Sequence, residues 1–269
     1  MKSFICGALT LLVCMAVDAK SVSGLYDTRV LVSDQQLANR QEGAQAGLME
    51  VLQKVSGFAP PLDNVVIRKA LGIADQYLYQ FSYATLSAQE QELAPVDSRW
   101  LNMRFEGKSI QRLIKAAKLP RWGKNRPNIM VWLAVDEAGE RQVIADDSSH
   151  PAKLALQGGA GKRGFPLMYP VYDLEDSRAL PIEQLWGLFL EPVQAASARY
   201  GAQSILAARL FKNPEGKWQG QWSFFFRSKE RNYVFETQSL DEQVLSGLTA
   251  AGHVLANHFA LKPTQGRGG

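Results

Sequence analysis

Residues 129–135 read IMVWLAV, and this stretch decides how the rest of the sequence is interpreted. A strand with one face in water alternates apolar and polar residues, whereas this run is apolar at every position. Such a run is typical of a central strand that is covered on both faces. Residues 204–210, which read SILAARL, predict a second strand of the same kind. We therefore expect an α/β protein whose sheet is covered by helices.

The sequence after residue 127 predicts the element order β-α-β-α-β-β-β-α. Pro181 suits the first turn of a strong helix that runs to about residue 200. Ser239 and Glu242 form a capping-box pattern that starts the last helix. The glycine-rich residues 153–164 lack the spacing of a phosphate-binding loop, so we expect a flexible loop there. The expected strands are residues 129–135, 165–171, 204–210, 217–227 and 232–237, with a further helix over residues 150–156.

The sequence between residues 20 and 126 predicts the order β-α-β-β-α. Gly57 is expected to end the first helix in a left-handed conformation. The polar residues 87–98 are expected to form a loop. A ferredoxin-like fold has this order, and the strand at residues 129–135 would complete it. The expected elements are strands at residues 25–32, 77–86 and 99–105, and helices at residues 33–56, 65–71 and 108–118.

Residues 120–127 contain two prolines, a glycine and three basic side chains, and are the best candidate for a boundary. The chain then divides into a first part at residues 20–126 and a second part at residues 127–262. We expect residues 120–127 to be a solvated loop. Residues 263–269 are expected to be a disordered tail.

The first nineteen residues have the layout of a secretory signal peptide. Lys2 provides the positive charge, residues 4–17 form an uncharged apolar run, and the small Ala19 suits a cleavage site. Cleavage after Ala19 would place the mature chain in the periplasm of a bacterium, without its only cysteines, Cys6 and Cys14. An uncleaved anchor and a lipidated Cys14 are alternatives that the sequence leaves open. No later apolar run is long enough to span a membrane, so we expect the mature chain to have no transmembrane segment.

Composition limits the functional classes. Of the 269 residues, 46% are hydrophobic and 21% are charged, which is ordinary for a globular protein. The net charge of +4 is too mild to indicate a nucleic-acid partner. His253 and His258 are five positions apart and do not share one helix face, so no metal site is expected, and no cofactor.

Carboxylates provide the candidate binding site. Asp136 and Asp173 each follow an expected strand of the second part, and Asp176 is close to Asp173 in the sequence. If those strands are parallel, the side chains share the edge at which open α/β sheets bind ligands. Two close carboxylates could serve acid-base catalysis or hold a divalent cation. The alternative is that they fill turns and helix caps, as Asp often does.

Several short motifs resemble a known family. They are Leu25-Tyr26, Leu52–Gly57, Trp132–Asp136, Pro166-Leu167 with Asp173-Leu174, and Arg199–Ala202. Together they are similar to the uncharacterised proteobacterial envelope family catalogued as domain of unknown function 2066, which provides no catalytic residues to transfer. Arg199–Ala202 and the strand after it also look like the periplasmic α/β modules of the TolB amino-terminal domain and of the curli secretion channel. That resemblance implies an anticodon-binding-like topology for the second part and a role in contacting other envelope proteins.

We expect an exported accessory or adaptor protein that binds an envelope protein or a cell-wall component without catalysis. The alternative is a metal-assisted or acid-base hydrolase that uses Asp136 and Asp173. A purely structural periplasmic protein is a third class. Substituting both aspartates by asparagine would separate the first two classes, because only the enzyme would lose an activity while remaining folded.

Overall fold

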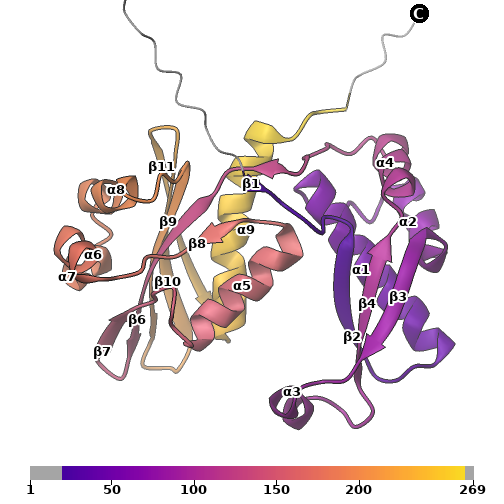
Figure 1. The fold of residues 1–269 in the computed structure, drawn as a ribbon, viewed down its shortest axis with the longest axis horizontal. Coiled ribbons are helices and arrows are strands. Elements are labelled where there is room, and N and C mark those ends of the chain that lie inside the picture. The colour runs from indigo at the N-terminus through magenta and orange to yellow at the C-terminus, as the bar shows by residue number, and fades with distance from the viewer. Residues whose placement is uncertain (1–19, 264–269) are drawn as a thin grey trace, which may run out of the picture.

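The computed structural model describes residues 20–263, which adopt a mixed α/β fold. The expected signal peptide, and the expected tail beyond Pro263, lie outside the described residues. Two groups of elements stand side by side in Figure 1, and each has its own sheet. The first half runs from β2 (Asp27–Val32) to α4 (Gly107–Ala116), and the second half runs from β6 (Ile129–Glu137) to α9 (Leu240–Phe259).

The first half is an antiparallel sheet with helices on one face. Between β2 and α4 it contains α1 (Leu37–Ser56), α2 (Val65–Leu71), the 3-10 helix η1 (Ala74–Tyr77), β3 (Leu78–Ala84), α3 (Ala88–Leu93) and β4 (Arg99–Phe105). The strands stand in the order β2-β4-β3, so the last strand in sequence lies between the other two. This is a split β-α-β arrangement. Helices α1, α2 and α4 bury one face of the sheet, and the opposite face is open (Figure 1).

Helix α1 illustrates why the elements form where the sequence predicts them. Leu48 and Val51 belong to its apolar stripe and are fully buried against the sheet. Each such side chain contributes about 1.5–3 kcal/mol on burial. The helix ends at Gly57, whose φ is 83°. A Cβ at Gly57 would lie 2.6 Å from the Cβ of Ala256 in the second half, so both conformation and space require glycine.

The second half is a mixed sheet with helices on both faces. Between β6 and α9 it contains β7 (Glu140–Val143), α5 (Pro151–Arg163), β8 (Leu167–Met168), α6 (Leu174–Ala179), α7 (Ile182–Trp186), α8 (Leu190–Ala198), β9 (Ser204–Lys212), β10 (Trp218–Phe226) and β11 (Lys229–Thr237). The strands stand in the order β11-β10-β9-β6-β7, and the short β8 pairs with β6. Strand β6 is parallel to β9 and β8, and the other pairs are antiparallel. Helices α5 and α9 cover one face, whereas α6, α7 and α8 cover the other.

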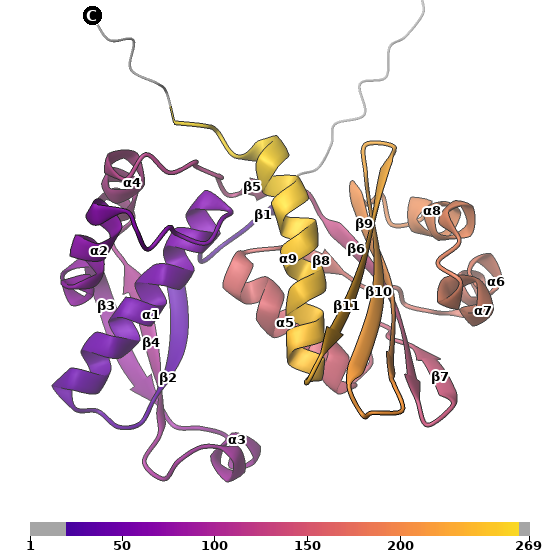
Figure 2. The ribbon, with the colours of Figure 1, turned by 180° about the vertical axis from the view of Figure 1, so that it is seen from behind.

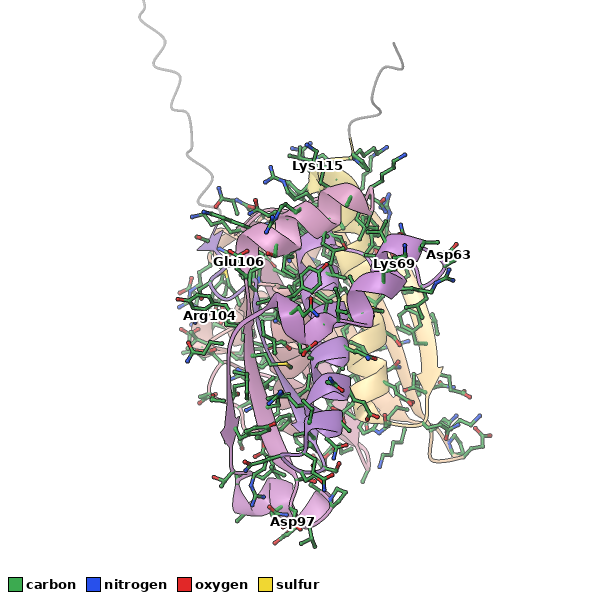
Figure 3. The ribbon with its side chains drawn as sticks, turned by 90° about the vertical axis from the view of Figure 1, so that its right-hand side faces the viewer. Asp63, Lys69, Asp97, Arg104, Glu106 and Lys115 are labelled. Atoms are coloured by element: carbon green, nitrogen blue, oxygen red, sulfur yellow. The ribbon has the colours of Figure 1, made fainter. Side chains whose placement is uncertain are left out.

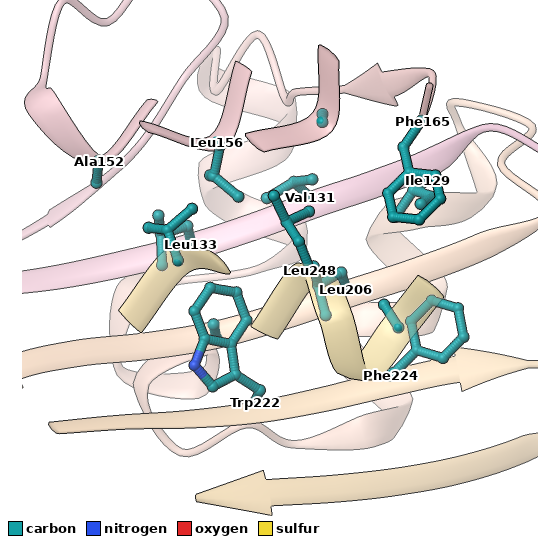
Figure 4. Close-up of a cluster of buried hydrophobic side chains, with 14 of the residues drawn as sticks. Ile129, Val131, Leu133, Ala152, Leu156, Phe165, Leu206, Trp222, Phe224 and Leu248 are labelled. Atoms are coloured by element: carbon teal, nitrogen blue, oxygen red, sulfur yellow. The ribbon is translucent and has the colours of Figure 1, made fainter. Parts of the chain in front are cut away.

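Strand β6 is buried on both faces, which confirms the interpretation of residues 129–135. On the face covered by α8, the indole N–H of Trp132 donates to the Oγ of Ser197 over 2.8 Å. Figure 4 shows the core on the opposite face, which includes Ile129, Val131, Leu133, Leu156, Phe165, Leu206, Trp222 and Leu248. The sheet of the second half is therefore the middle layer of three.

The same strand corrects an expectation for the first half. Strand β6 pairs with β9, β7 and β8, and the first sheet has three strands among the described residues. The expectation that residues 129–135 complete a ferredoxin-like sheet is therefore wrong. The physical reason is burial, because an all-apolar strand needs two covered faces and the first sheet has only one.

Three local expectations are also wrong. Residues 153–164 belong largely to helix α5 instead of a loop, because α5 packs closely on α9 and glycine permits that approach. Residues 87–98 contain the short helix α3, whose first turn is closed by a capping box. The helix expected over residues 181–200 is divided into α7 and α8, with the left-handed residue Leu188 (φ 53°) between them.

The connection between the two halves is partly buried. It contains β5 (Asn125–Arg126), which pairs with β1 (Lys20–Ser21). Trp122 is 2% exposed and Arg126 has no exposed surface. The expectation of a solvated loop at residues 120–127 therefore holds only in part, since residues 121 and 123–125 are exposed. Basic composition alone does not tell the exposed Arg121 from the buried Arg126.

Arg126 joins segments from both halves. Its guanidinium donates to the carbonyl oxygen of Lys54 near the end of α1, and to those of Arg163 (2.6 Å) and Gly164 (3.1 Å) at the end of α5. Carbonyl groups at helix C-termini carry partial negative charge and favour a cation. Burial nevertheless lowers the pKa of Arg126 to about 10. We call this arrangement the Arg126 clamp.

Candidate functional site

A cleft of about 1030 Å³ lies between the first sheet and helix α5. We call it the β2 cleft. Its lining comes from β2 (residues 27–31), β3 (residues 80–82), β4 (Trp100 and residues 102–104), α1 (Ala46, Glu50 and Lys54) and α5 (Gln157, Gly158, Gly161 and Lys162). The open face of the first sheet is its floor, and α5 is one wall. The cleft therefore requires both halves of the molecule.

Strand β2 is an edge strand, and its free edge borders the cleft. The carbonyl of Tyr26 accepts from the N–H of Phe105 over 2.9 Å, which fixes the alternation of the β2–β4 ladder. By that alternation, the backbone groups of Asp27, Arg29 and Leu31 point away from β4. Among residues 20–263, the N–H and C=O of Arg29 and Leu31 make no backbone hydrogen bond at this edge. They are available to a ligand in the cleft.

A buried ionic group closes one end of this edge. The Nζ of Lys54 donates to the carbonyl oxygen of Asp27 over 2.7 Å and lies 3.0 Å from Glu50 Oε1. The Oγ1 of Thr28 donates to the same carboxylate oxygen over 2.6 Å. Lys54 is only 5% exposed, and a buried charge is stable only with such partners. This end of the cleft is therefore fixed, and the accessible edge begins at Arg29.

Two glycines of α5 face the cleft. A Cβ added at Gly158 or Gly161 would meet no atom within 4 Å, whereas one at Gly159 would lie 2.8 Å from Leu248. Glycine inside a helix costs about 1 kcal/mol relative to alanine. Packing within the chain explains Gly159 but not the two glycines that line the cleft. They leave bare helix backbone opposite the free edge of β2.

The open face of the sheet carries paired charges. Arg104 donates from Nε and Nη2 to the carboxylate of Asp27 over 2.8 and 3.1 Å, and this hydrogen bonding raises the pKa of Arg104. Figure 3 shows Arg104 on the side of the sheet opposite α1. Arg29 lies 4.3 Å from the ring centre of Trp100 and 4.0 Å from Glu90. The floor thus offers many hydrogen-bonding groups and little uncompensated charge.

Asp173 and Asp176, both expected at a binding site, are brought together by Arg199. Arg199 donates to the two oxygens of Asp173 over 2.9 and 2.8 Å, and to Asp176 over 3.0 Å. Its guanidinium holds the pKa of Asp173 well below the usual range, and the backbone N–H of Asp176 adds to this. Asp176 is 1% exposed and also accepts from the hydroxyl of Tyr200. Asp173 caps α6 as well, so both carboxylates have structural partners.

Asp136 lies apart from this pair, at the turn between β6 and β7. It accepts from the N–H of Gly139 over 2.9 Å and from Nε of Arg141 over 3.3 Å. Asp136 and Asp173 therefore each bind an arginine of their own. Within residues 20–263, no group of three or more His, Cys, Asp or Glu side chains is placed to hold a metal ion.

Sequence reasoning missed the residues that line the β2 cleft. Gly158 and Gly161 were visible in the sequence, but a glycine-rich stretch favours a loop when its neighbours are unknown. The free edge of β2 has no local signal, since edge position depends on the whole sheet. Every helix in the part of the chain that the structure describes is too short or too polar to cross a lipid bilayer.

Comparison with known families covers the first half of the chain. Residues 19–123 match a family described as Domain of unknown function (DUF8605). No curated protein matches the chain. The resemblance to domain of unknown function 2066 is therefore wrong, and the match, which ends at residue 123, gives no support to the likeness with the TolB and curli modules. The motif Leu52–Gly57, for example, is the buried end of a helix and its glycine cap, which unrelated proteins share. Over residues 19–123, this chain is similar to the DUF8605 family.

Proposed function

We propose that this protein is an exported, non-catalytic adaptor of the bacterial envelope that holds an extended segment of a partner protein in the β2 cleft. The observation that carries the proposal is the free edge of β2 opposite two glycines that no packing explains. Edge strands bind extended peptides by adding a strand to the sheet. The backbone hydrogen bonds then provide affinity for any sequence.

The geometry supports this mode of binding. An added strand would lie about 4.8 Å from β2 and pair with Arg29 and Leu31. The bare surface of α5 at Gly158 and Gly161 leaves room on its other side. Leu31 is 40% exposed at the cleft, so the partner also gains an apolar contact. The volume of about 1030 Å³ is at the upper end for small-molecule sites, which favours an extended ligand.

Export rests on the sequence of the first nineteen residues, and the family match supports it. The matched region begins at residue 19, where the signal peptide is expected to end. The hydrolase alternative gains no support, because Asp136 and Asp173 are each bound by a separate arginine.

Site-specific photo-crosslinking in cells tests the proposal. A photoreactive amino acid replaces Ser82 or Gly161 in the full chain, and Glu191 on α8 serves as the control position because it is exposed and outside the cleft. We expect one discrete adduct from both cleft positions and none from the control. Equal labelling from Glu191, or none from the cleft, would refute strand binding in the cleft.

A proline substitution makes the test specific for the edge. Leu31→Pro removes an N–H that points into the cleft and leaves the β2–β4 ladder intact. We expect the adduct to fall at least about tenfold, since one backbone hydrogen bond is lost and the proline ring stands where the added strand would pair. Leu31→Ala keeps the N–H and is the matched control, which should retain most of the adduct. A full adduct in the proline variant would rule out strand addition.

A further inference from the structure

A second pocket lies far from the β2 cleft, between α9 and the hairpin that joins β10 to β11. Its volume is about 670 Å³. Figure 2 shows β11 running alongside α9, with this hairpin at the same end as the C-terminus of the helix. The pocket is lined by Arg227, Lys229 and Arg231 from the hairpin and by His253 and His258 from α9. We call it the hairpin pocket.

The three cations of the hairpin pocket have no acidic partner. No aspartate or glutamate lines the pocket. Among residues 20–263, no carboxylate lies within 4.0 Å of Arg227, Lys229 or Arg231, whereas Arg199, Arg104 and Lys217 each have at least one. The neighbouring Glu230 points to the opposite face, because side chains alternate along a strand. The pocket therefore has uncompensated positive charge.

Two of these cations share one face of the sheet. Lys229 stands opposite Phe226 and Arg231 opposite Phe224, so both point to the face that α9 covers. The next residues on that face, Tyr233 and Phe235, pack against the apolar core. The strand is thus apolar where α9 covers it and cationic where the pocket opens. Arg227, Lys229 and Arg231 are exposed, so their charged groups are open to a ligand that enters the pocket from solvent.

We propose that the hairpin pocket binds the phosphate group of a phosphate ester. Two guanidinium groups can each donate two hydrogen bonds to phosphate oxygens, and a lysine adds a point charge. The ring of His258 packs on Phe226 at 5.2 Å, so its N–H is held at the pocket. The volume of about 670 Å³ exceeds the size of a bare phosphate, and the aromatic side chains provide a wall for the group that carries it.

A titration with inorganic phosphate at constant ionic strength tests the site, and backbone NMR of the mature chain is its readout. We expect saturable shifts confined to residues 227–233 and 253–258. Arg227→Gln, Lys229→Gln and Arg231→Gln together should weaken binding at least tenfold, since each charged hydrogen bond contributes substantially to affinity. The single variant Arg231→Gln should give a smaller loss and serves if the triple variant fails to fold.

A matched variant removes the same charge elsewhere. Lys69→Gln, Lys115→Gln and Lys124→Gln change exposed lysines outside the pocket, and Figure 3 shows Lys69 and Lys115 on the first half. This control should bind phosphate as the unchanged protein does. Equal loss in both triple variants, or shifts that do not saturate, would overturn the proposal.

Vesicles separate a lipid headgroup from a soluble phosphate ester. Vesicles that contain phosphatidylglycerol are compared with vesicles of phosphatidylcholine alone. Binding to the former that depends on Arg227, Lys229 and Arg231 supports a lipid source, and phosphate binding without vesicle binding supports a soluble ester. Vesicle binding that survives the pocket substitutions, with no phosphate binding, would overturn the site. Leu31→Pro should leave phosphate binding unchanged, so this site and the adaptor proposal can fail separately.

Discussion

Arg199 binds both oxygens of Asp173 and also reaches Asp176, so one cation organises the loop before α6. Asp136 holds the β6–β7 turn in the same way through Gly139. The sequence singles out Asp136 and Asp173 because they follow expected strands, and Asp176 because it is close to Asp173. The ends of strands are also where turns and helix caps need a hydrogen-bond acceptor. The contacts of these carboxylates show that they serve as such acceptors and bind arginines.

The Asp173–Arg199 pair predicts a loss of stability in acid. The pKa of Asp173 is lower in the folded chain than in the unfolded chain, so the unfolded chain binds more protons as the pH falls. The stabilisation is therefore complete above pH about 4, the ordinary pKa of Asp, and is lost as the pH falls further toward the lowered pKa. The free energy of unfolding, measured with urea at several pH values between 6 and 2, tests this prediction.

The variant Asp173→Asn should flatten this dependence, because asparagine does not titrate. Asp63→Asn is the matched control, since Asp63 is exposed on the first half (Figure 3) and forms no salt bridge among the described residues. If the free energy of unfolding of Asp173→Asn fell in acid as steeply as that of the unchanged protein, Arg199 would not stabilise the fold through this carboxylate.

At the scale of elements, helix α5 combines two kinds of glycine that should respond oppositely to alanine. Gly158→Ala should stabilise the protein by about 0.5–1 kcal/mol, because the new methyl group meets open space and alanine favours helix. Gly159→Ala should destabilise it by about 1 kcal/mol, because its Cβ would press on the fully buried Leu248. Urea unfolding of both variants checks the difference. Equal effects would contradict the packing of α5 on α9.

A helix or strand could be predicted from the sequence where residues close to it in the chain determine it. Strand β4 has the predicted bounds, and α1 ends at the predicted Gly57, because apolar spacing and a left-handed cap are local features. The capping box of Ser87 and Glu90 was also present in the sequence and would have predicted α3. Helix α5 could not be recognised in the same way, because its glycines are explained by Leu248, almost ninety positions later.

At the scale of the whole molecule, the Arg126 clamp should couple the two halves. Arg126→Met removes the donors to carbonyl groups of α1 and α5 and leaves those oxygens unpaired. We expect a loss of about 3 kcal/mol. Circular dichroism and tryptophan fluorescence should then report different unfolding midpoints, as the halves unfold separately. Arg121→Met, in the same segment but exposed, should unfold in one transition as the unchanged protein does.

The β2 cleft could not be predicted from the sequence, for a related reason. Its floor and its glycine wall belong to different halves, and only the clamp brings them together. The mixed α/β class, by contrast, followed from runs such as residues 129–135, whose burial on two faces is a property of one strand. Local patterns therefore predicted the layers, and the cleft required their arrangement.

The Arg126 clamp also sets the order in which the chain can form the β2 cleft. Arg126 lies 72 positions after Lys54, whose carbonyl oxygen it binds. Arg163, whose carbonyl oxygen it also binds, lies a further 37 positions along the chain. Contacts between distant positions form late, because chain closure must precede them. The first half can assemble its own core while α5 is still unfolded, but the cleft has no second wall until the clamp closes. The proposed partner segment would therefore meet a complete groove only on a chain that has finished folding.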